Sequence, residues 1–295
     1  MFKGKADMAK GSFYANPLWD DPAEGNEEVR KKYPYGASKN VWVKELPAME
    51  GAFKETGRLV YDTAELLVKH CDKLVQSRHP SHGSRLHELA FTKSKMLAGR
   101  LLHYFAPSAD DASPDENWCG WHNDNSVITG LVPALWLYED TGEEAPASAV
   151  SGSGGLYIQG RDRSVIRVSL PPDCLGFQIG EASQILSGGV LVATPHQVRP
   201  LAGKQERPIC RETFALFIEP QWDAPIGPPE GVGYDSVLKE EESELIPPLS
   251  KRLKITKDAA PVIFGEYLGD SFKDCTTIST TDALEGEVLP SAVIE

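Results

Sequence analysis

The sequence predicts a mostly β protein with N-terminal helices, arranged as a barrel or jelly roll of strands packed against helical segments in one domain. Two observations support this fold class. Between residues 46 and 75, apolar side chains recur at steps of three and four, which is the period of an amphipathic helix. From Arg100 onward, short apolar runs follow one another closely, with Gly, Pro, Asp and Ser between them, as in sandwiches and barrels.

The N-terminal third divides into two segments. Residues 1–45 are rich in Gly, Pro, Asn and charge and predict an irregular lead-in, with no strand before the first helix. Residues 46–99 predict a helical support region, with a long helix over 46–75 that has Pro47 in its first turn and a shorter helix over 84–96. The apolar stripe expected to face the core comprises Met49, Phe53, Thr56, Val60, Ala64, Leu67, Cys71 and Leu74.

The rest of the chain divides into a strand-rich core, residues 100–222, and a Pro-rich acidic extension, residues 223–295. Within the core, residues 157–168 predict a hairpin that turns at 160–163. In the extension, the apolar stretch 262–272 is expected to dock on the core. The apolar runs expected as strands begin at residues 100, 127, 154, 164, 174, 188 and 213.

Charge and composition narrow the class of partner. The net charge is −13, which disfavours binding to a phosphate backbone and favours a small-molecule substrate. No apolar run approaches the roughly 18 residues that span a bilayer, so no membrane association is predicted. Five scattered cysteines without a CxxC motif predict unpaired, inert thiols and a cytoplasmic location, with nuclear and plastid locations left open. The sequence makes no prediction of oligomeric state.

Three residues could hold a metal ion. His122 and Asp124 stand two apart in WHNDNSVITGL, so on a strand they share a face. Two histidines follow His103 in the sequence, and His196 is the second of them. Two histidines and one carboxylate can form a facial triad for iron that leaves open coordination positions. From the residues alone, the facial-triad hypothesis and the alternative, in which His122 and His196 have only structural roles, are equally well supported.

A second pair of residues suggests an anion-binding site. Arg211 and Thr213 are also two apart in RETFALF, and a guanidinium can hold a carboxylate through two parallel hydrogen bonds. A buried arginine requires an anionic partner, because an unpaired buried charge is costly. A carboxylate of the protein or of a dicarboxylate co-substrate would serve.

Together these segments resemble the 2-oxoglutarate- and Fe(II)-dependent dioxygenases of the isopenicillin N synthase-like superfamily. The resemblance covers about residues 100–220 and rests on WHNDNSVITGL, GGLYIQGRDRSVIRV, FQIGEASQILSGGVLVATPHQV and RETFALF, in the family's order. It implies a double-stranded β-helix, or jelly-roll, core. The segments KGSFYANP and KSKMLAGRLLHYFAP resemble a plant and algal branch of the superfamily.

The resemblance assigns roles to individual residues. It implies that His122, Asp124 and His196 bind Fe(II), and that Arg211, Thr213 and Tyr104 bind the far carboxylate of the co-substrate 2-oxoglutarate. It also implies O₂ as a reactant and ascorbate as a reductant.

Some residues depart from the family pattern. Arg211 follows His196 by more residues than usual, which makes Arg207 a competitor, although Pro208 and the lack of a strand pattern favour Arg211. Leu102 stands where many members have asparagine. Glu181 replaces an aspartate and is expected as a turn residue, not a ligand.

The implied function is oxidation of a small organic molecule with release of succinate and CO₂. Because the carboxylate Asp124 is present, hydroxylation, desaturation or demethylation is favoured over halogenation. Two alternatives remain: an iron oxidase of the same fold that does not use 2-oxoglutarate, and a non-catalytic binding protein that retains the fold.

Overall fold

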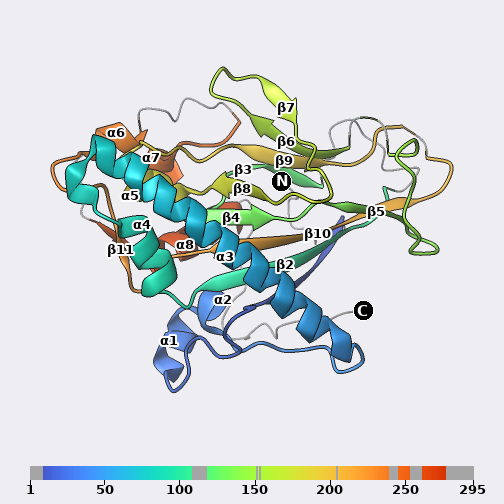
Figure 1. Cartoon of the computed structure of the whole chain (residues 1–295), viewed down its shortest axis with the longest axis horizontal. Coiled ribbons are helices and arrows are strands. Elements are labelled where there is room, and N and C mark those ends of the chain that lie inside the picture. The colour runs from blue at the N-terminus through green and yellow to red at the C-terminus, as the bar shows by residue number, and fades with distance from the viewer. Residues whose placement is uncertain are drawn as a thin grey trace.

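The computed structural model describes residues 9–107, 118–150, 152, 154–203, 205–238, 245–252 and 261–276. Two main antiparallel sheets, a separate two-stranded sheet and a set of helices make up this part of the chain (Figure 1). The prediction of a mostly β protein with N-terminal helices is therefore confirmed. No helix in the described ranges is long and apolar enough to cross a bilayer.

The larger sheet has the strand order β1-β2-β10-β4-β8, with β5 also paired to β10. Its central strand, β10, alternates between two environments. Arg211, Thr213 and Phe217 face the smaller sheet and line a cavity, whereas Phe214 and Leu216 face the opposite way into the main hydrophobic core. The strands of this sheet are β1 (Lys10–Ala15), β2 (Leu97–Tyr104), β4 (Ile128–Leu131), β5 (Leu135–Tyr138), β8 (Gly176–Ile179) and β10 (Ile209–Ile218).

The smaller sheet has the order β3-β9-β6-β7. Its strands β6 and β7 form the predicted hairpin, in which Gly160 N–H donates to the Ser164 carbonyl and Arg163 has φ 66°. One cavity of about 170 Å³ is lined by residues of both sheets and therefore lies between them. The strands are β3 (Cys119–His122), β6 (Gly155–Gln159), β7 (Val165–Arg167) and β9 (His196–Arg199).

The long helix α3 (Pro47–Arg78) crosses the outer face of the larger sheet (Figure 1). Gly130 of β4 permits this close approach, since a Cβ there would lie 2.2 Å from Val60 Cγ1. The predicted helix is confirmed, but Leu67 and Leu74 of its expected apolar stripe are exposed. The buried face of α3 is rotated about the helix axis from the predicted stripe. Burial depends on which side of the helix contacts the sheet, and not only on which residues are apolar. Its buried residues are Phe53, Gly57, Val60, Tyr61, Ala64, Val68, Asp72 and Val75.

The second predicted helix is shorter than residues 84–96 suggest. It consists of α4 (Arg85–His87) and one π-helical turn, η2 (Glu88–Thr92), after a 3₁₀ turn, η1 (Pro80–His82). The buried carboxylate of Asp72 organises this corner: it accepts hydrogen bonds from the backbone N–H groups of Leu86 and His87 and lies 2.6 Å from His82 Nε2.

The N-terminal segment is more regular than predicted. β1 pairs with β2, and α1 (Glu27–Lys32) and α2 (Pro34–Ala37) follow it. The expectation of no strand before the first helix is therefore wrong. The alternation of apolar and polar residues in β1 is weak because β1 is an edge strand that exposes Tyr14.

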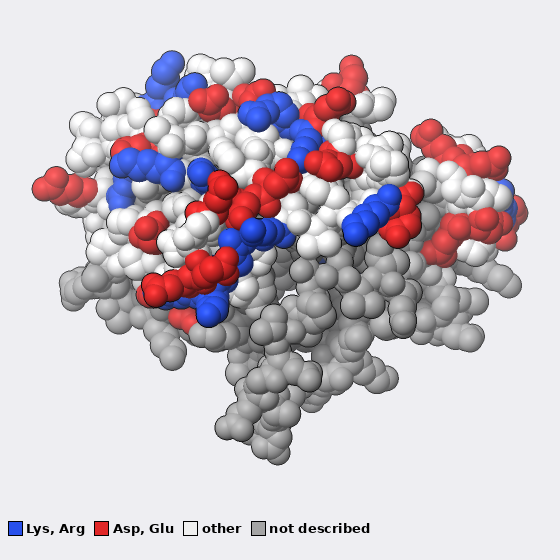
Figure 2. All heavy atoms as spheres, turned by 90° about the horizontal axis from the view of Figure 1, so that it is seen from below, with Lys and Arg blue, Asp and Glu red and all other residues white. Residues whose placement is uncertain are grey.

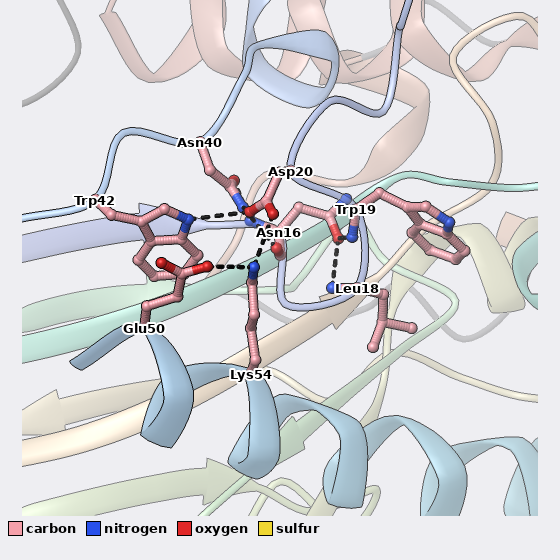
Figure 3. A network of polar contacts seen from close by, with 8 residues as sticks. All are labelled: Asn16, Leu18, Trp19, Asp20, Asn40, Trp42, Glu50 and Lys54. Carbon is pink, nitrogen blue, oxygen red and sulfur yellow. Dashed lines mark hydrogen bonds and ion pairs between the residues drawn. The ribbon is translucent and has the colours of Figure 1, made fainter. Parts of the chain in front are cut away.

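A polar network ties this segment to α3 (Figure 3). Asp20 accepts hydrogen bonds from Asn40 Nδ2 and Trp42 Nε1 and from Lys54 Nζ, which also lies 2.6 Å from Glu50. Asn16 caps the turn by accepting from the N–H groups of Leu18 and Trp19. Side chains far apart in sequence hold the segment, which explains why local sequence pattern does not reveal it.

The C-terminal extension contributes to the core. Phe264 and Tyr267 of α8 (Phe264–Thr276) are buried in the main cluster, beside Trp222 and Ile226. The acidic run at 239–244 and the tail from 277 lie outside the described residues. The division of the chain at residues 45, 99 and 222 stays a prediction. The remaining elements are α5 (Glu181–Leu186), β11 (Pro225–Ile226), α6 (Tyr234–Leu238), α7 (Leu249–Arg252) and β12 (Val262–Ile263).

Acidic and basic side chains are interspersed on the face seen in Figure 2, where the described surface shows no continuous basic stripe. Such a mixed surface is typical of a protein without a phosphate-backbone footprint on that face. The expected lack of nucleic-acid binding stays a prediction.

Candidate active site

His122 and His196 are direct cross-strand partners on β3 and β9, and their ring centroids are 4.1 Å apart. Asp124 follows the end of β3, and its Oδ1 lies 3.8 Å from His122 Nε2 and 3.6 Å from His196 Nε2. One potential ligand atom from each of the three residues lies within 4.8 Å of the others. The structure therefore brings together the three predicted metal ligands, although Asp124 gets there from a loop and not from the strand.

Both imidazoles are oriented by their backbone surroundings. His122 Nδ1 lies 2.8 Å from the Gly120 carbonyl and His196 Nδ1 lies 3.1 Å from the Thr194 carbonyl. A ring nitrogen that faces a carbonyl must carry the proton, so each ring, in its neutral form, presents the Nε2 lone pair towards Asp124. This arrangement fits a divalent metal ion bound by two Nε2 atoms and one carboxylate oxygen.

The loop that carries Asp124 is fixed from behind by Glu181 and Tyr267. Glu181 is fully buried, its N–H donates to the Asp124 carbonyl, and its carboxylate accepts from Asn123 Nδ2. The Tyr267 hydroxyl lies 2.7 Å from Glu181 Oε2 and 2.9 Å from Asn125 Oδ1. Glu181 is thus a buried anchor of the loop and more than the simple turn residue predicted.

Gln178 is a site residue that the sequence did not reveal. From β8, its Nε2 lies 3.0 Å from Asp124 Oδ2 and 3.2 Å from His196 Nε2. One lone pair on His196 Nε2 cannot bind both an amide proton and a metal ion, so metal binding would displace that contact. The sequence signal was present in FQIG, where Gln178 interrupts an apolar strand.

The two imidazoles differ in their pKa values. Burial and the charge of His122 lower the pKa of His196 to about 4, which keeps it neutral as a ligand must be. For His122, burial lowers the pKa, but Cys119 and Asp124 outweigh this effect and raise it to about 9. Metal binding to His122 therefore has to release a proton.

Arg211 lies in the same cavity and is only 7% exposed. Its Nε and Nη1 are buried and have no hydrogen-bond partner, and no carboxylate among the described residues forms an ion pair with it. The guanidinium carbon lies 5.3 Å from the ring centre of Tyr104 and 5.9 Å from that of Trp136. Burial lowers the pKa of Arg211. A buried cation with unsatisfied donors indicates a binding position for an anion.

The residues expected beside Arg211 are present there. Thr213 and Tyr104 both line the cavity, and so does Leu102. Burial raises the pKa of Tyr104 to about 12, so its hydroxyl keeps its proton and can donate to an anion. Thr213 Oγ1 donates weakly, at 3.3 Å, to the Val132 carbonyl.

The structure distinguishes Arg211 from Arg207 as the candidate anion-binding arginine. Arg207 is only partly exposed, lies 2.6 Å from Asp140, and is not among the residues that line the cavity. Phe217 lines the cavity, whereas Trp118 is buried against Tyr104 at a ring distance of 5.2 Å. Asn125 points to Tyr267 instead.

Cys119 lies beside the predicted metal ligand His122. It lines the cavity with its Sγ 3.6 Å from His122 Nδ1. Although burial raises the pKa of this thiol, His122 outweighs that effect and lowers it. Cys71, Cys174 and Cys210 are free, as predicted.

A second group of potential ligands lies on the opposite face of the larger sheet. His103, Cys210 and Glu212 converge there, and His103 bonds through Nδ1 to Glu212 and approaches Glu139 through Nε2 at 3.5 Å. Because both ring nitrogens already have carboxylate partners, this group is sufficiently explained as an ion-pair cluster.

No protein-family model matches the sequence, and no curated protein matches it. Solved structures do. A full-length Neurospora crassa protein in complex with alpha-KG aligns with TM-score 0.55 and 17% identity over 90% of this chain and 69% of that one. A 2OG-Fe(II) oxygenase family protein of Caulobacter crescentus aligns with TM-score 0.56 and 18% identity, over 92% and 71%.

JOX2 in complex with 2OG, Fe and JA aligns with TM-score 0.54 and 17% identity over 89% of this chain and 60% of that one. This chain has the fold of the 2OG-Fe(II) oxygenases. At such low identity the likeness establishes the fold alone.

Proposed function

We propose that this protein is a non-haem Fe(II)- and 2-oxoglutarate-dependent oxygenase built on a double-stranded β-helix core. It oxidises a small organic molecule with release of succinate and CO₂. In this proposal His122, Asp124 and His196 hold Fe(II), and Arg211 binds the far carboxylate of 2-oxoglutarate with help from Thr213 and Tyr104.

One observation supports the proposal most strongly. A two-histidine, one-carboxylate group and a buried arginine with unpartnered nitrogens share a single cavity. The triad alone would suit several metals, and the arginine alone would suit many anions. Their combination matches a dicarboxylate that reaches the metal with one end and a guanidinium with the other.

In this proposal, the residues that line the cavity position 2-oxoglutarate and shield the reacting atoms from water. Arg211 would fix the depth of the dicarboxylate, and Trp136 and Tyr104 would keep its guanidinium in place. The apolar walls, among them Leu102, Leu131 and Val198, would exclude water from the reacting atoms. When bound, Fe(II) and 2-oxoglutarate supply O₂ activation coupled to oxidative decarboxylation.

The structural relatives support this function by analogy, since the Neurospora crassa protein was crystallised with alpha-KG and JOX2 with 2OG and Fe. The finer predictions from the sequence remain predictions. These are the plant and algal branch, the use of ascorbate, a hydroxylation, desaturation or demethylation outcome, and the cytoplasmic location.

Anaerobic titration of the protein with Fe(II) and 2-oxoglutarate tests the proposal. We expect the weak visible charge-transfer band of the metal chelate, which His196→Ala should abolish. Arg207→Gln is the matched surface control and should leave the band unchanged. If wild-type protein shows no band and releases no succinate in air, the non-catalytic alternative holds. Substrate oxidation without 2-oxoglutarate would instead support the iron-oxidase alternative.

A further inference from the structure

The long helix α3 carries a second apolar stripe, on the side that faces away from the sheet. No other helix or strand in the described part of the chain lies across that outer side (Figure 1). Single exposed leucines are common on protein surfaces, whereas a row of them on one helix face indicates an interaction surface. The exposed fractions are 61% for Leu59, 62% for Leu66, 39% for Leu67 and 49% for Leu74.

The outer stripe keeps to one face of the helix. Thr63 and His70 stand between the leucines, so positions 59, 63, 66, 67, 70 and 74 follow one another at steps of four, three, one, three and four. The Thr63 hydroxyl donates to the Leu59 carbonyl at 2.8 Å and therefore needs no other partner. From its first to its last leucine the stripe is roughly 22 Å long, at about 1.5 Å per residue.

The order of these steps is the same in both directions along the helix. Two copies of α3 can therefore lie antiparallel about a two-fold axis that passes between Leu66 and Leu67. Leu59 then lies at the level of Leu74 of the other copy, and Leu66 lies at the level of Leu67. A two-fold interface requires a surface that is complementary to itself, and the outer stripe meets this requirement.

Charged residues beside the stripe favour the same antiparallel orientation. Asp62 precedes Leu66 by four residues and Lys73 follows it by seven, so both lie on one flank of the stripe. Both are exposed, and neither forms an ion pair with another residue in the described ranges.

The two-fold axis makes this flank of one copy face the same flank of the other. Asp62 then lies at the level of position 71 of the other copy, only about 3 Å along the helix axis from Lys73. A parallel pairing would instead put Asp62 at the level of Asp62, and Lys73 at the level of Lys73. Opposite charges therefore meet in the antiparallel pair alone.

We propose that two copies of this chain associate through the outer face of α3, as an antiparallel pair of helices centred between Leu66 and Leu67. The leucines of both copies are removed from water, and Asp62 of each copy lies beside Lys73 of the other. One helix face makes a small interface, so the dimer is in reversible equilibrium with the monomer. The candidate active site lies on the other side of the larger sheet, so this proposal does not depend on the proposed function.

Sedimentation velocity of the full chain tests the proposal. Dimerisation follows mass action, so the sedimentation coefficient should rise from the monomer towards the dimer value between about 2 and 200 µM protein. Leu66→Gln and Leu67→Gln should each raise the Kd for dimerisation about tenfold or more, because both lie at the centre of the interface. The matched control is Leu135→Gln, at a leucine of β5 that is 53% exposed, and should leave the Kd unchanged.

Reversal of the two charges tests the orientation. Asp62→Lys and Lys73→Asp should each raise the Kd about fivefold, since each change occurs twice in the dimer. The double variant Asp62→Lys/Lys73→Asp should recover most of that loss, because opposite charges meet again. Apolar association without a defined register would not show this recovery.

A chain that sediments as a monomer at every concentration overturns the proposal. A dimer that both leucine variants leave intact also overturns it, because the contact would then lie elsewhere. Failure of the double variant to recover overturns the antiparallel pairing. Circular dichroism confirms that each variant is folded, which we expect because all four substituted side chains are exposed.

Discussion

Arg211 lies directly opposite Tyr104 in the pairing of β10 with β2, and its guanidinium carbon is 5.3 Å from the centre of the phenol ring. This contact leaves Nε and Nη1 of the arginine buried without a hydrogen bond. An anion that satisfies these donors would gain both charge pairing and hydrogen bonds. The relationship between the two residues leads to two predictions of opposite sign.

The first concerns affinity for the co-substrate. Arg211→Gln should raise the 2-oxoglutarate concentration needed for half-maximal succinate release by about 30-fold or more, because truncating a buried charge pair costs about 2–5 kcal/mol. Steady-state assays over a range of 2-oxoglutarate concentrations measure this. Unchanged dependence on 2-oxoglutarate would contradict the assignment of Arg211, and Arg207→Gln serves as the control.

The second concerns stability without the co-substrate. Arg211→Met should raise the free energy of unfolding by about 1–4 kcal/mol, because an apolar side chain replaces a buried, uncompensated charge. Urea denaturation with no 2-oxoglutarate present measures the change. Arg207→Met, at an exposed ion pair, should have little effect. A large loss of stability in Arg211→Met would mean that the guanidinium is already satisfied in the free protein.

The third prediction concerns the helix behind the metal loop. Tyr267→Phe removes the hydroxyl that contacts Glu181 and Asn125, so Asp124 should be held less firmly. Loss of such an outer contact typically lowers metal affinity about 10- to 100-fold. Competition titration with a chelator measures it. Tyr61→Phe removes a comparably buried hydroxyl far from the loop and should leave metal affinity unchanged. Equal affinities in both variants would show that α8 does not position the loop.

The fourth prediction concerns pH. Burial, with a contribution from Asp124, raises the pKa of Glu219 from 4.5 to about 8. Between these values the native state keeps a proton that the unfolded chain releases, so the stabilising contribution is full below about 4.5 and is lost as the pH rises to 8.

Glu219→Gln should therefore lessen the decline in stability of the metal-free protein between about pH 5 and 8. Denaturation at several pH values compares the slopes. Since His122 and His196 titrate in both proteins, the difference between the slopes isolates Glu219. Parallel curves for the two proteins would contradict the shifted pKa.

The fifth prediction concerns packing. Gly130→Ala should destabilise the protein by about 1–3 kcal/mol, because the new methyl group would overlap Val60 of α3. Gly51→Ala is the matched control, since a Cβ on this residue of α3 meets nothing within 4 Å and alanine favours a helix. Thermal denaturation measures both changes. An unchanged stability of Gly130→Ala would contradict the close contact between α3 and β4.

Residues whose placement follows from the alternation of side chains along a single strand were predictable. The strand alternation that places Arg211 and Thr213 on one face is visible in RETFALF, and His122 and His196 stand in equally short strand patterns. β1 and the network around Asp20 were not predictable, because their partners lie on β2 and α3. Gln178, Cys119 and Tyr267 were missed for the same reason: each joins the site through contacts between separate elements.

The sequence by itself determined the class of fold, the three candidate metal ligands and the candidate anion-binding arginine, because strand period and residue type are local properties. Only the tertiary structure decided that Arg211 forms no ion pair with a carboxylate of the described residues, whereas Arg207 pairs with Asp140. It also decided that Arg100 and Arg167, 67 positions apart, line one cavity. Charge compensation depends on distances across the fold, and those distances are set by how the two sheets pair and pack.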